Sequence, residues 1–279
     1  AISQKRPLPS GLFSILRVMT EESNNLSEPP PEHPKRARSR GIYLLPNLFT
    51  TAALFAGFYA VLASMNDQFE KAAIAIFLAM ILDGLDGRVA RMTNTQTAFG
   101  AEYDSLSDMV AFGLAPALVM YQWGLSDLGK IGWLAAFIYT AGAALRLARF
   151  NSQLATADKR YFTGLPSPSA AAVLAGSVWV AVDNGLQPEA LSWLAALLTA
   201  ATGLFMVSNI KYYSFKQVDF KGKVPFFSIV LVMLVFAVVL TAPALVLFVI
   251  FFVYTLAGPA LSLRRLVLAR EKRKARKAG

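Results

Sequence analysis

Hydrophobic residues form long uninterrupted runs along most of this chain. From Ile42 onward, apolar runs of about 20 residues, the length that spans a bilayer as a helix, alternate with short polar connections. The runs lack the alternation of apolar and polar positions that is typical of a half-buried strand. An open sheet would also leave backbone groups without partners in lipid. The pattern therefore predicts an all-α, polytopic bundle of transmembrane helices.

The pattern predicts about eight spans. They lie near residues 43–64, 71–92, 102–124, 131–150, 168–184, 189–208, 225–240 and 243–263. Basic residues concentrate in the connections after the second, fourth and sixth spans, whereas the connections after the first, third and fifth carry acidic residues. By the positive-inside rule the basic connections face the cytoplasm, so we expect both termini to be cytoplasmic.

Composition supports this interpretation and narrows the chemistry. The 279 residues are 56% hydrophobic and 16% charged, with a mean hydropathy of +0.49. Cysteine is absent, which excludes disulfides and thiolate nucleophiles, and the single histidine, His33, lies in a proline-rich segment before the first span. A general base is therefore expected to be a carboxylate. The net charge of +10 comes largely from residues that flank the spans, which favours membrane lipids over nucleic acid as partners.

Four aspartates interrupt the apolar pattern at one end of the second and third spans. They are Asp83, Asp86, Asp104 and Asp108. A charge at membrane depth costs roughly 2.5 to 3.5 kcal/mol on insertion scales, so such residues are candidates for a functional site. Residues three or four apart share a helix face, and a tight turn between the two spans would bring both pairs together. Four like charges in one pocket must be protonated or neutralised, and a divalent cation would neutralise them. Oxygen ligands favour Mg²⁺ or Mn²⁺, with Ca²⁺ as a further candidate, over zinc.

Small residues accompany the acids, at positions where a bulky ligand could approach the helix backbone. They are Gly84, Gly87, Ala90 and Gly100. A simpler alternative is a buried salt-bridge network with Arg88 and Arg91, in which the small residues only pack helices together. A second alternative is a divalent-cation transporter, although its acids would be expected near the bilayer midplane, in discontinuous helices and inverted repeats.

The segment 83–108 resembles the CDP-alcohol phosphatidyltransferase family. Its signature is D-x-x-D-G-x-x-A-R, eight residues, then G-x-x-x-D-x-x-x-D. Every fixed position matches, at Asp83, Asp86, Gly87, Ala90, Arg91, Gly100, Asp104 and Asp108. The resemblance implies a membrane-embedded transfer of a phosphatidyl group from a CDP-linked lipid to an alcohol, with release of CMP.

The resemblance also implies roles for these residues. Asp83, Asp86 and Asp104 would hold one or two metal ions against the pyrophosphate. Asp108 would contact metal as well and act as the base for the incoming hydroxyl. Gly87, Ala90 and Gly100 would line the cytidine pocket, with Arg91 near the phosphates. Gly84, which the signature does not fix, is a further candidate for close approach of the CDP-linked lipid.

Composition, hydropathy and the same resemblance together suggest how the chain is divided. We expect a largely disordered basic cytosolic arm at 1–41 and a six-helix core at 42–218. Two additional transmembrane helices would follow at 219–263, and a basic cytosolic tail at 264–279. Small-residue helix faces and the additional helices leave room for a homodimer.

Four segments outside the signature indicate which alcohol accepts the phosphatidyl group. They are LPNLFT, RLARFN, YFTGLPSPS and MVSNIKYYSFK, at 45–50, 146–151, 161–169 and 206–216. They resemble the phosphatidylserine synthases of the bacterial integral-membrane type, which implies CDP-diacylglycerol and L-serine as substrates. It also implies a location in the bacterial inner membrane, and by the positive-inside rule we expect the active site to face the cytoplasm.

Two arginines are candidates for binding the acceptor. Arg149, and Arg146 one helical turn before it, could bind the serine carboxylate through a guanidinium fork. Both could instead be positive-inside anchors. They would equally suit glycerol 3-phosphate or inositol phosphate as acceptor, and choline is another acceptor within the same chemistry.

Overall fold

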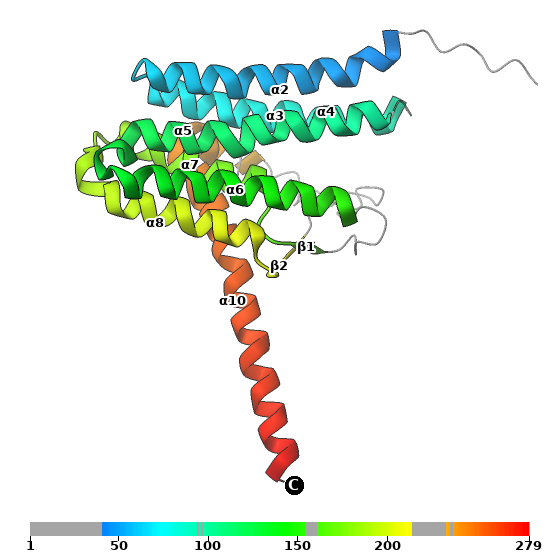
Figure 1. Cartoon of the computed structure of the whole chain (residues 1–279), viewed down its shortest axis with the longest axis vertical. Helices are drawn as coiled ribbons and strands as arrows, with labels where there is room; N and C mark the ends of the chain where they lie inside the picture. The colour runs from blue at the N-terminus through cyan, green and yellow to red at the C-terminus, as the bar shows by residue number, and fades with distance from the viewer. Residues whose placement is uncertain are drawn as a thin grey trace, which may run out of the picture. The chain divides into compact units, whose positions relative to one another are not determined.

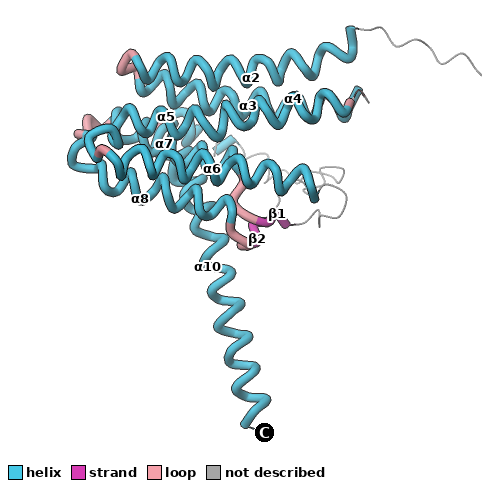
Figure 2. Tube along the Cα trace, viewed as in Figure 1, coloured by secondary structure: helices cyan, strands magenta, loops and turns pink. Residues whose placement is uncertain are grey.

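Helices account for nearly all of the structure, a computed structural model (Figures 1 and 2). It describes residues 41–93, 95, 97–153, 161–213, 233–234 and 237–278. The helices are α2 (Gly41–Met65), α3 (Phe69–Thr93), α4 (Ala98–Asp108), η1 (Met109–Leu114), α5 (Ala115–Met120), η2 (Tyr121–Leu125), η3 (Ser126–Leu128), α6 (Lys130–Gln153), α7 (Ser167–Asp183), α8 (Pro188–Val207) and α10 (Pro243–Ala278). The all-α class predicted from the sequence is confirmed. The predicted N-terminal arm and most of the span near 225–240 lie outside the described residues.

Within the described residues, five helical stretches are long and apolar enough to cross a membrane. They are Pro46–Met65, Ala98–Leu128, Lys130–Ser152, Pro188–Val207 and Pro243–Ser262. Helix α7 is apolar but shorter. Helix α3 is not among the five, because its C-terminal half carries Asp83, Asp86, Arg88 and Arg91. The expected count of about eight spans and the cytoplasmic location of both termini stay predictions.

The helices pack through small residues. Helix α2 packs against α3 and also against α4, α6 packs against α8, and α7 contacts α3, α5 and α10. A Cβ atom added at Gly142 would lie 2.5 Å from the carbonyl oxygen of Gly203, so α6 and α8 meet backbone to backbone. At Gly57 the added atom would lie 2.7 Å from Cα of Ala111. Close approach through small residues is the usual way in which helices associate in lipid.

The third predicted span changes its helical geometry directly after Asp108. The segments η1 and η2 are π-helical, and a π-helical turn contains an extra residue and is frequent at functional sites. The fully buried Tyr139 of α6 donates its hydroxyl to the Phe112 carbonyl oxygen at 2.9 Å. This bond gives the carbonyl oxygen a partner from a neighbouring helix, so α6 stabilises the widened turn that follows Asp108.

Two short strands join connections that are distant in sequence. Strand β1 (Tyr161–Thr163) precedes α7, and β2 (Lys211–Tyr213) follows α8; they pair antiparallel with Phe162 opposite Tyr212. Gly164 follows β1 with φ of +84°, and a Cβ atom there would collide with the Met206 carbonyl oxygen. Glycine is therefore required at this position. The sequence pattern did not predict this ladder.

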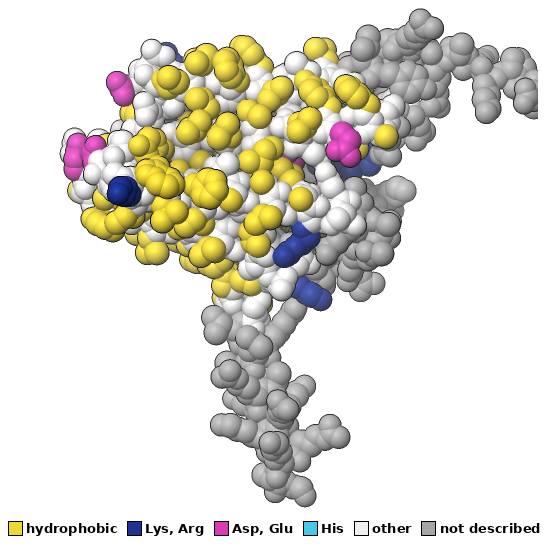
Figure 3. Space-filling view, viewed as in Figure 1, with side chains coloured by type: hydrophobic (Ala, Val, Ile, Leu, Met, Phe, Trp, Pro, Cys, Tyr) yellow, Lys and Arg dark blue, Asp and Glu magenta, His cyan; other side chains and the backbone are white. Residues whose placement is uncertain are grey.

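Hydrophobic side chains cover most of the face seen in Figure 3, whereas charged side chains lie mainly toward the two ends of the helices. Exposed large apolar residues include Phe55, Trp193 and Leu197, at 67%, 65% and 67% exposure. An exposed apolar area of this kind marks a surface that meets a nonaqueous partner. Here it is consistent with helices that face lipid.

Candidate functional site

Three of the four signature aspartates come together between α3 and α4. One carboxylate oxygen from each of Asp83, Asp104 and Asp108 lies within 4.8 Å of the other two, and all three residues are half-buried. Helix α4 begins at an N-cap, where the Thr97 hydroxyl accepts the backbone N–H of Gly100 at 3.0 Å. The cap fixes the start of α4 so that Asp104 and Asp108, one turn apart, both face α3.

Asp86 has a different environment. It is 5% exposed, and its Oδ2 accepts a hydrogen bond of 2.7 Å from the Thr50 hydroxyl of α2. Three residues along a helix correspond to a rotation of about 300°, so Asp86 is turned by about 60° from Asp83. The expected convergence of all four acids is therefore seen for three, and the fourth faces α2.

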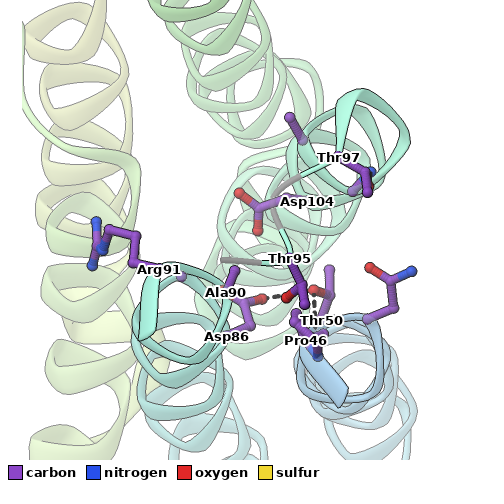
Figure 4. A pocket seen from close by; sticks show the side chains of 12 residues that line it. Pro46, Thr50, Asp86, Ala90, Arg91, Thr95, Thr97 and Asp104 are labelled. Atoms are coloured by element: carbon purple, nitrogen blue, oxygen red, sulfur yellow. Dashed lines mark hydrogen bonds between the residues drawn. The ribbon is translucent and has the colours of Figure 1, made fainter. Parts of the chain in front are cut away.

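A cavity of about 250 Å³ lies next to the acids, between α2, α3 and α4. It is lined by Pro46, Asn47, Thr50, Asp86, Gly87, Ala90, Arg91, Thr95, Thr97, Gly100, Ala101 and Asp104. In Figure 4, Asp104 lies on one side of the cavity, and Asp86 and Thr50 lie on the opposite side. The Arg91 side chain extends away from Thr50. Asp86 and Asp104 thus both border the cavity.

Four of the five residues expected to bind the CDP-linked lipid line this cavity. They are Gly87, Ala90, Arg91 and Gly100. A Cβ atom at Gly87 would meet nothing within 4 Å, so this glycine borders open space. Gly84 also borders open space but is not part of the lining. Arg88 and Arg91 are both exposed, which argues against the alternative of a buried salt-bridge network.

The two candidate arginines lie in different surroundings at the end of α6. Arg146 donates from Nη1 to the hydroxyl of Ser167, the first residue of α7, at 2.6 Å, and it interacts electrostatically with Asp108. Arg149 donates to Oδ1 of Asn209, after α8, at 3.2 Å. The structure thus places Arg146 beside the acid cluster, whereas Arg149 contacts the segment between α8 and β2.

Sequence reasoning missed Thr50. Its hydroxyl bonds Asp86 on α3, and its carbonyl oxygen accepts the Ser107 hydroxyl of α4 at 3.0 Å. One residue of α2 therefore links both acid-bearing helices. Pro46, Asn47 and Thr50 share a helix face because they are three and four positions apart, and this spacing could have identified the α2 side of the cavity.

The acid cluster fits a divalent cation. Three carboxylates this close repel one another unless one is protonated or a positive charge lies between them. Carboxylate oxygens are also the ligands that hard ions such as Mg²⁺, Mn²⁺ and Ca²⁺ prefer. The donor set is therefore suited to such an ion, and it does not distinguish among the three metals.

Comparison with known families matches residues 43–206 to the CDP-alcohol phosphatidyltransferases. The chain belongs to the CDP-alcohol phosphatidyltransferase family. The matched region runs from α2 to the end of α8 and contains the acid cluster, the cavity and both candidate arginines. The family resemblance inferred from the signature is confirmed, and the chain is a membrane transferase of phospholipid biosynthesis.

Curated relatives within the family carry related names. A CDP-diacylglycerol–serine O-phosphatidyltransferase of Helicobacter pylori (strain ATCC 700392 / 26695) is 38% identical over 200 residues, which cover 70% of this chain and 82% of the relative. One of Mycobacterium leprae (strain TN) is 32% identical over 227 residues, 79% of this chain and 75% of the relative. An archaetidylserine synthase of Methanothermobacter thermautotrophicus is 34% identical over 170 residues, 60% of this chain and 69% of the relative.

Proposed function

We propose that this protein transfers the phosphatidyl group of CDP-diacylglycerol to the hydroxyl of L-serine, giving phosphatidylserine and CMP. The observation that carries the chemistry is the cluster of Asp83, Asp104 and Asp108 beside a cavity lined by the family signature. The choice of serine is supported by the relatives, which are named as serine O-phosphatidyltransferases. This chain matches them over most of their length.

The CDP group would occupy the cavity between α2, α3 and α4. Gly87, Ala90 and Gly100 leave room for the nucleotide, and Arg91 would lie near the phosphates. The cavity adjoins apolar helices, so the acyl chains would stay in the bilayer while the polar group enters the bundle. Serine and CMP would enter and leave at the cytoplasmic side of the bacterial inner membrane.

Asp83, Asp104 and Asp108 would hold Mg²⁺ or Mn²⁺, with Asp86 completing the ligand set and Ca²⁺ as a further candidate occupant. A bound divalent ion neutralises charge on phosphate oxygens during phosphoryl-type transfer. The chain itself supplies the ligand positions, and Thr50 fixes Asp86 from α2.

Asp108 would accept the proton of the serine hydroxyl, because a carboxylate within reach of the nucleophile can act as general base. The serine oxygen would bond to the phosphorus that carries diacylglycerol, while the bond from that phosphorus to the bridging oxygen of CMP breaks. Arg146 would bind the serine carboxylate through charge-assisted hydrogen bonds, since Ser167 orients its guanidinium next to Asp108. Arg149, one helical turn further along α6, would also contribute to binding the serine carboxylate.

The acceptor is tested by giving purified protein CDP-diacylglycerol with one acceptor at a time. We expect CMP release with L-serine and far less with glycerol 3-phosphate, inositol phosphate or choline. Preferential use of another acceptor would refute the serine assignment while leaving the family chemistry intact. Flux of Mg²⁺ or Mn²⁺ into protein-containing vesicles without nucleotide would instead support the transporter alternative.

A further inference from the structure

The C-terminal end of α6, which carries Arg146, is fastened to two different neighbours. Arg149 donates to Oδ1 of Asn209 at 3.2 Å, which ties the helix to the segment after α8. Asn151, in the last turn, donates from Nδ2 to the hydroxyl of Ser105 on α4 at 3.0 Å. The last carbonyl groups of a helix lack intrahelical partners, so contacts of this kind determine where the helix end lies.

The bond from Asn151 reaches α4 on the side of the acid cluster. The Ser105 hydroxyl donates to the Ala101 carbonyl oxygen at 3.1 Å, and its oxygen accepts from Asn151. A hydroxyl has one proton and two lone pairs, so the two bonds are compatible. Ser105 and Asp108 are three positions apart and share a face of α4. The end of α6 is thus bonded one turn away from Asp108.

Two hydrogen bonds join α6 to the helical stretch that contains Asp108, one on each side of that residue. Asn151 bonds Ser105, and Tyr139 bonds a carbonyl oxygen of η1 at 2.9 Å. The later residue of α6 contacts the earlier part of the stretch, so the two segments run antiparallel. Arg146 lies between Tyr139 and Asn151 along α6, as Asp108 lies between Ser105 and η1. The two bonds therefore set the register in which Arg146 comes opposite Asp108.

Helix α4 is fastened to α2 by a separate bond. The Ser107 hydroxyl donates to the Thr50 carbonyl oxygen at 3.0 Å. An α-helix turns by about 100° per residue, so Ser105 and Ser107 point about 160° apart, and both acids of α4 lie in the interval between them. One serine thus connects α4 to the helix with the candidate acceptor arginines. The other connects it to the helix that borders the nucleotide cavity.

We propose that Asn151 is a positioning residue for the acceptor: its hydrogen bond to Ser105 holds the end of α6 where one serine molecule reaches both Arg146 and Asp108. The inference rests on the proposed function, in which Arg146 binds the serine carboxylate and Asp108 accepts the hydroxyl proton. Only two carbon atoms separate these two groups of serine. A shift of about 1 Å between the residues that hold them is therefore costly, since misplacement of that size lowers rates by up to about 100-fold.

The test removes a hydroxyl from either side of α4. Ser105→Ala should raise the KM for serine about tenfold, near the upper end of what a neutral hydrogen bond contributes. The KM for CDP-diacylglycerol and the metal concentration for half-maximal activity should not change. Ser105→Thr keeps the hydroxyl and should keep the wild-type KM for serine. Ser107→Ala, the matched control, removes the bond toward α2 and should leave the KM for serine unchanged.

A second variant and a double variant test whether the two residues act together. Asn151→Ala should raise the KM for serine as much as Ser105→Ala does, and the double variant should raise it no further, because residues that act as a unit are not additive. An unchanged KM for serine in Asn151→Ala would overturn the inference. An equal increase in Ser107→Ala, or a parallel increase in the KM for CDP-diacylglycerol, would do the same, since the bond would then only support the bundle.

The proposed function can fail separately from this inference. If the wild-type protein prefers another acceptor, the serine assignment fails, and the KM of Asn151→Ala for that acceptor decides the role of Asn151. An increase there supports a positioning residue for the other acceptor, and no increase overturns the inference.

Discussion

The hydrogen bond between Thr50 and Asp86 can be removed with little change in shape. The Thr50 hydroxyl lies 2.7 Å from Oδ2 of Asp86, and the two residues are 4% and 5% exposed. Thr50→Val replaces the hydroxyl by a methyl group and keeps the backbone carbonyl that Ser107 of α4 contacts. The substitution therefore isolates the contact to Asp86 from the link to α4.

The size of the effect follows from what the carboxylate loses. A hydrogen bond to a charged group contributes about 1.5 to 3 kcal/mol to the stability of that group's position. A buried acceptor that is left without its partner, and without water in its place, costs this full amount. Removal of a group that orients a metal ligand typically lowers metal affinity about 10 to 100-fold, which agrees with that energy. We therefore expect Thr50→Val to raise the metal concentration for half-maximal activity about 10 to 100-fold.

The assay is serine-dependent CMP release by protein treated with EDTA and then titrated with Mg²⁺ or Mn²⁺. Thr51→Val is the matched control, because the neighbouring Thr51 hydroxyl contacts the Asn47 carbonyl oxygen at 2.7 Å and the Tyr103 hydroxyl at 2.9 Å. The control should leave the metal requirement unchanged. A metal requirement in Thr50→Val equal to that of the wild-type protein would refute the idea that Thr50 orients Asp86 as a ligand.

Four further predictions concern the acids, the metal and the packing of the bundle. Asp108→Asn should abolish transfer while thermal unfolding stays cooperative, and robust CMP release by this variant would contradict its assignment as base. EDTA should abolish activity and added Mg²⁺ or Mn²⁺ should restore it; full activity in excess chelator would exclude a required metal. Tyr139→Phe leaves the buried Phe112 carbonyl oxygen without its 2.9 Å partner and should destabilise the fold by about 1 to 3 kcal/mol, measured as a fall in Tm in detergent. Gly203→Val should lower the Tm further, because even a Cβ atom would lie 2.7 Å from Cα of Tyr139; an unchanged Tm would show that α6 and α8 can separate without loss.

Most helices could be predicted from the sequence because the lipid environment makes the apolar pattern unambiguous. The predicted spans 43–64, 71–92, 131–150 and 189–208 correspond to Gly41–Met65, Phe69–Thr93, Lys130–Gln153 and Pro188–Val207. The span predicted at 102–124 was too short, since the helical stretch runs from Ala98 to Leu128. Its π-helical segments depend on contacts such as that from Tyr139, and local sequence carries little information about them.

The β1–β2 ladder escaped prediction for a similar reason. Its strands have three residues each and lie about 50 positions apart, so pairing depends on the tertiary arrangement rather than on alternation within either segment. The conformation of Gly164 has the same origin, because the Met206 carbonyl oxygen that excludes a side chain belongs to α8.

The site was predictable where helical spacing alone determines it. The aligned pairs of acids on adjacent spans predicted a cluster of all four, and the structure brings together Asp83, Asp104 and Asp108 but not Asp86. The surroundings of Asp86 depend on Thr50, and those of Arg146 depend on Ser167, both from other helices. These contacts required the packed bundle. The division of the chain into four segments, the roles of individual residues and the homodimer stay predictions.

The most direct test of the proposed chemistry is serine-dependent CMP release by the wild-type protein and by Asp104→Asn. Asp104 is one of the three clustered acids and also borders the cavity. With CDP-diacylglycerol, L-serine and a divalent metal, the wild-type protein should form CMP and phosphatidylserine in equal amounts, and folded Asp104→Asn should form neither. Equal rates for the two proteins would show that transfer does not take place at the acid cluster.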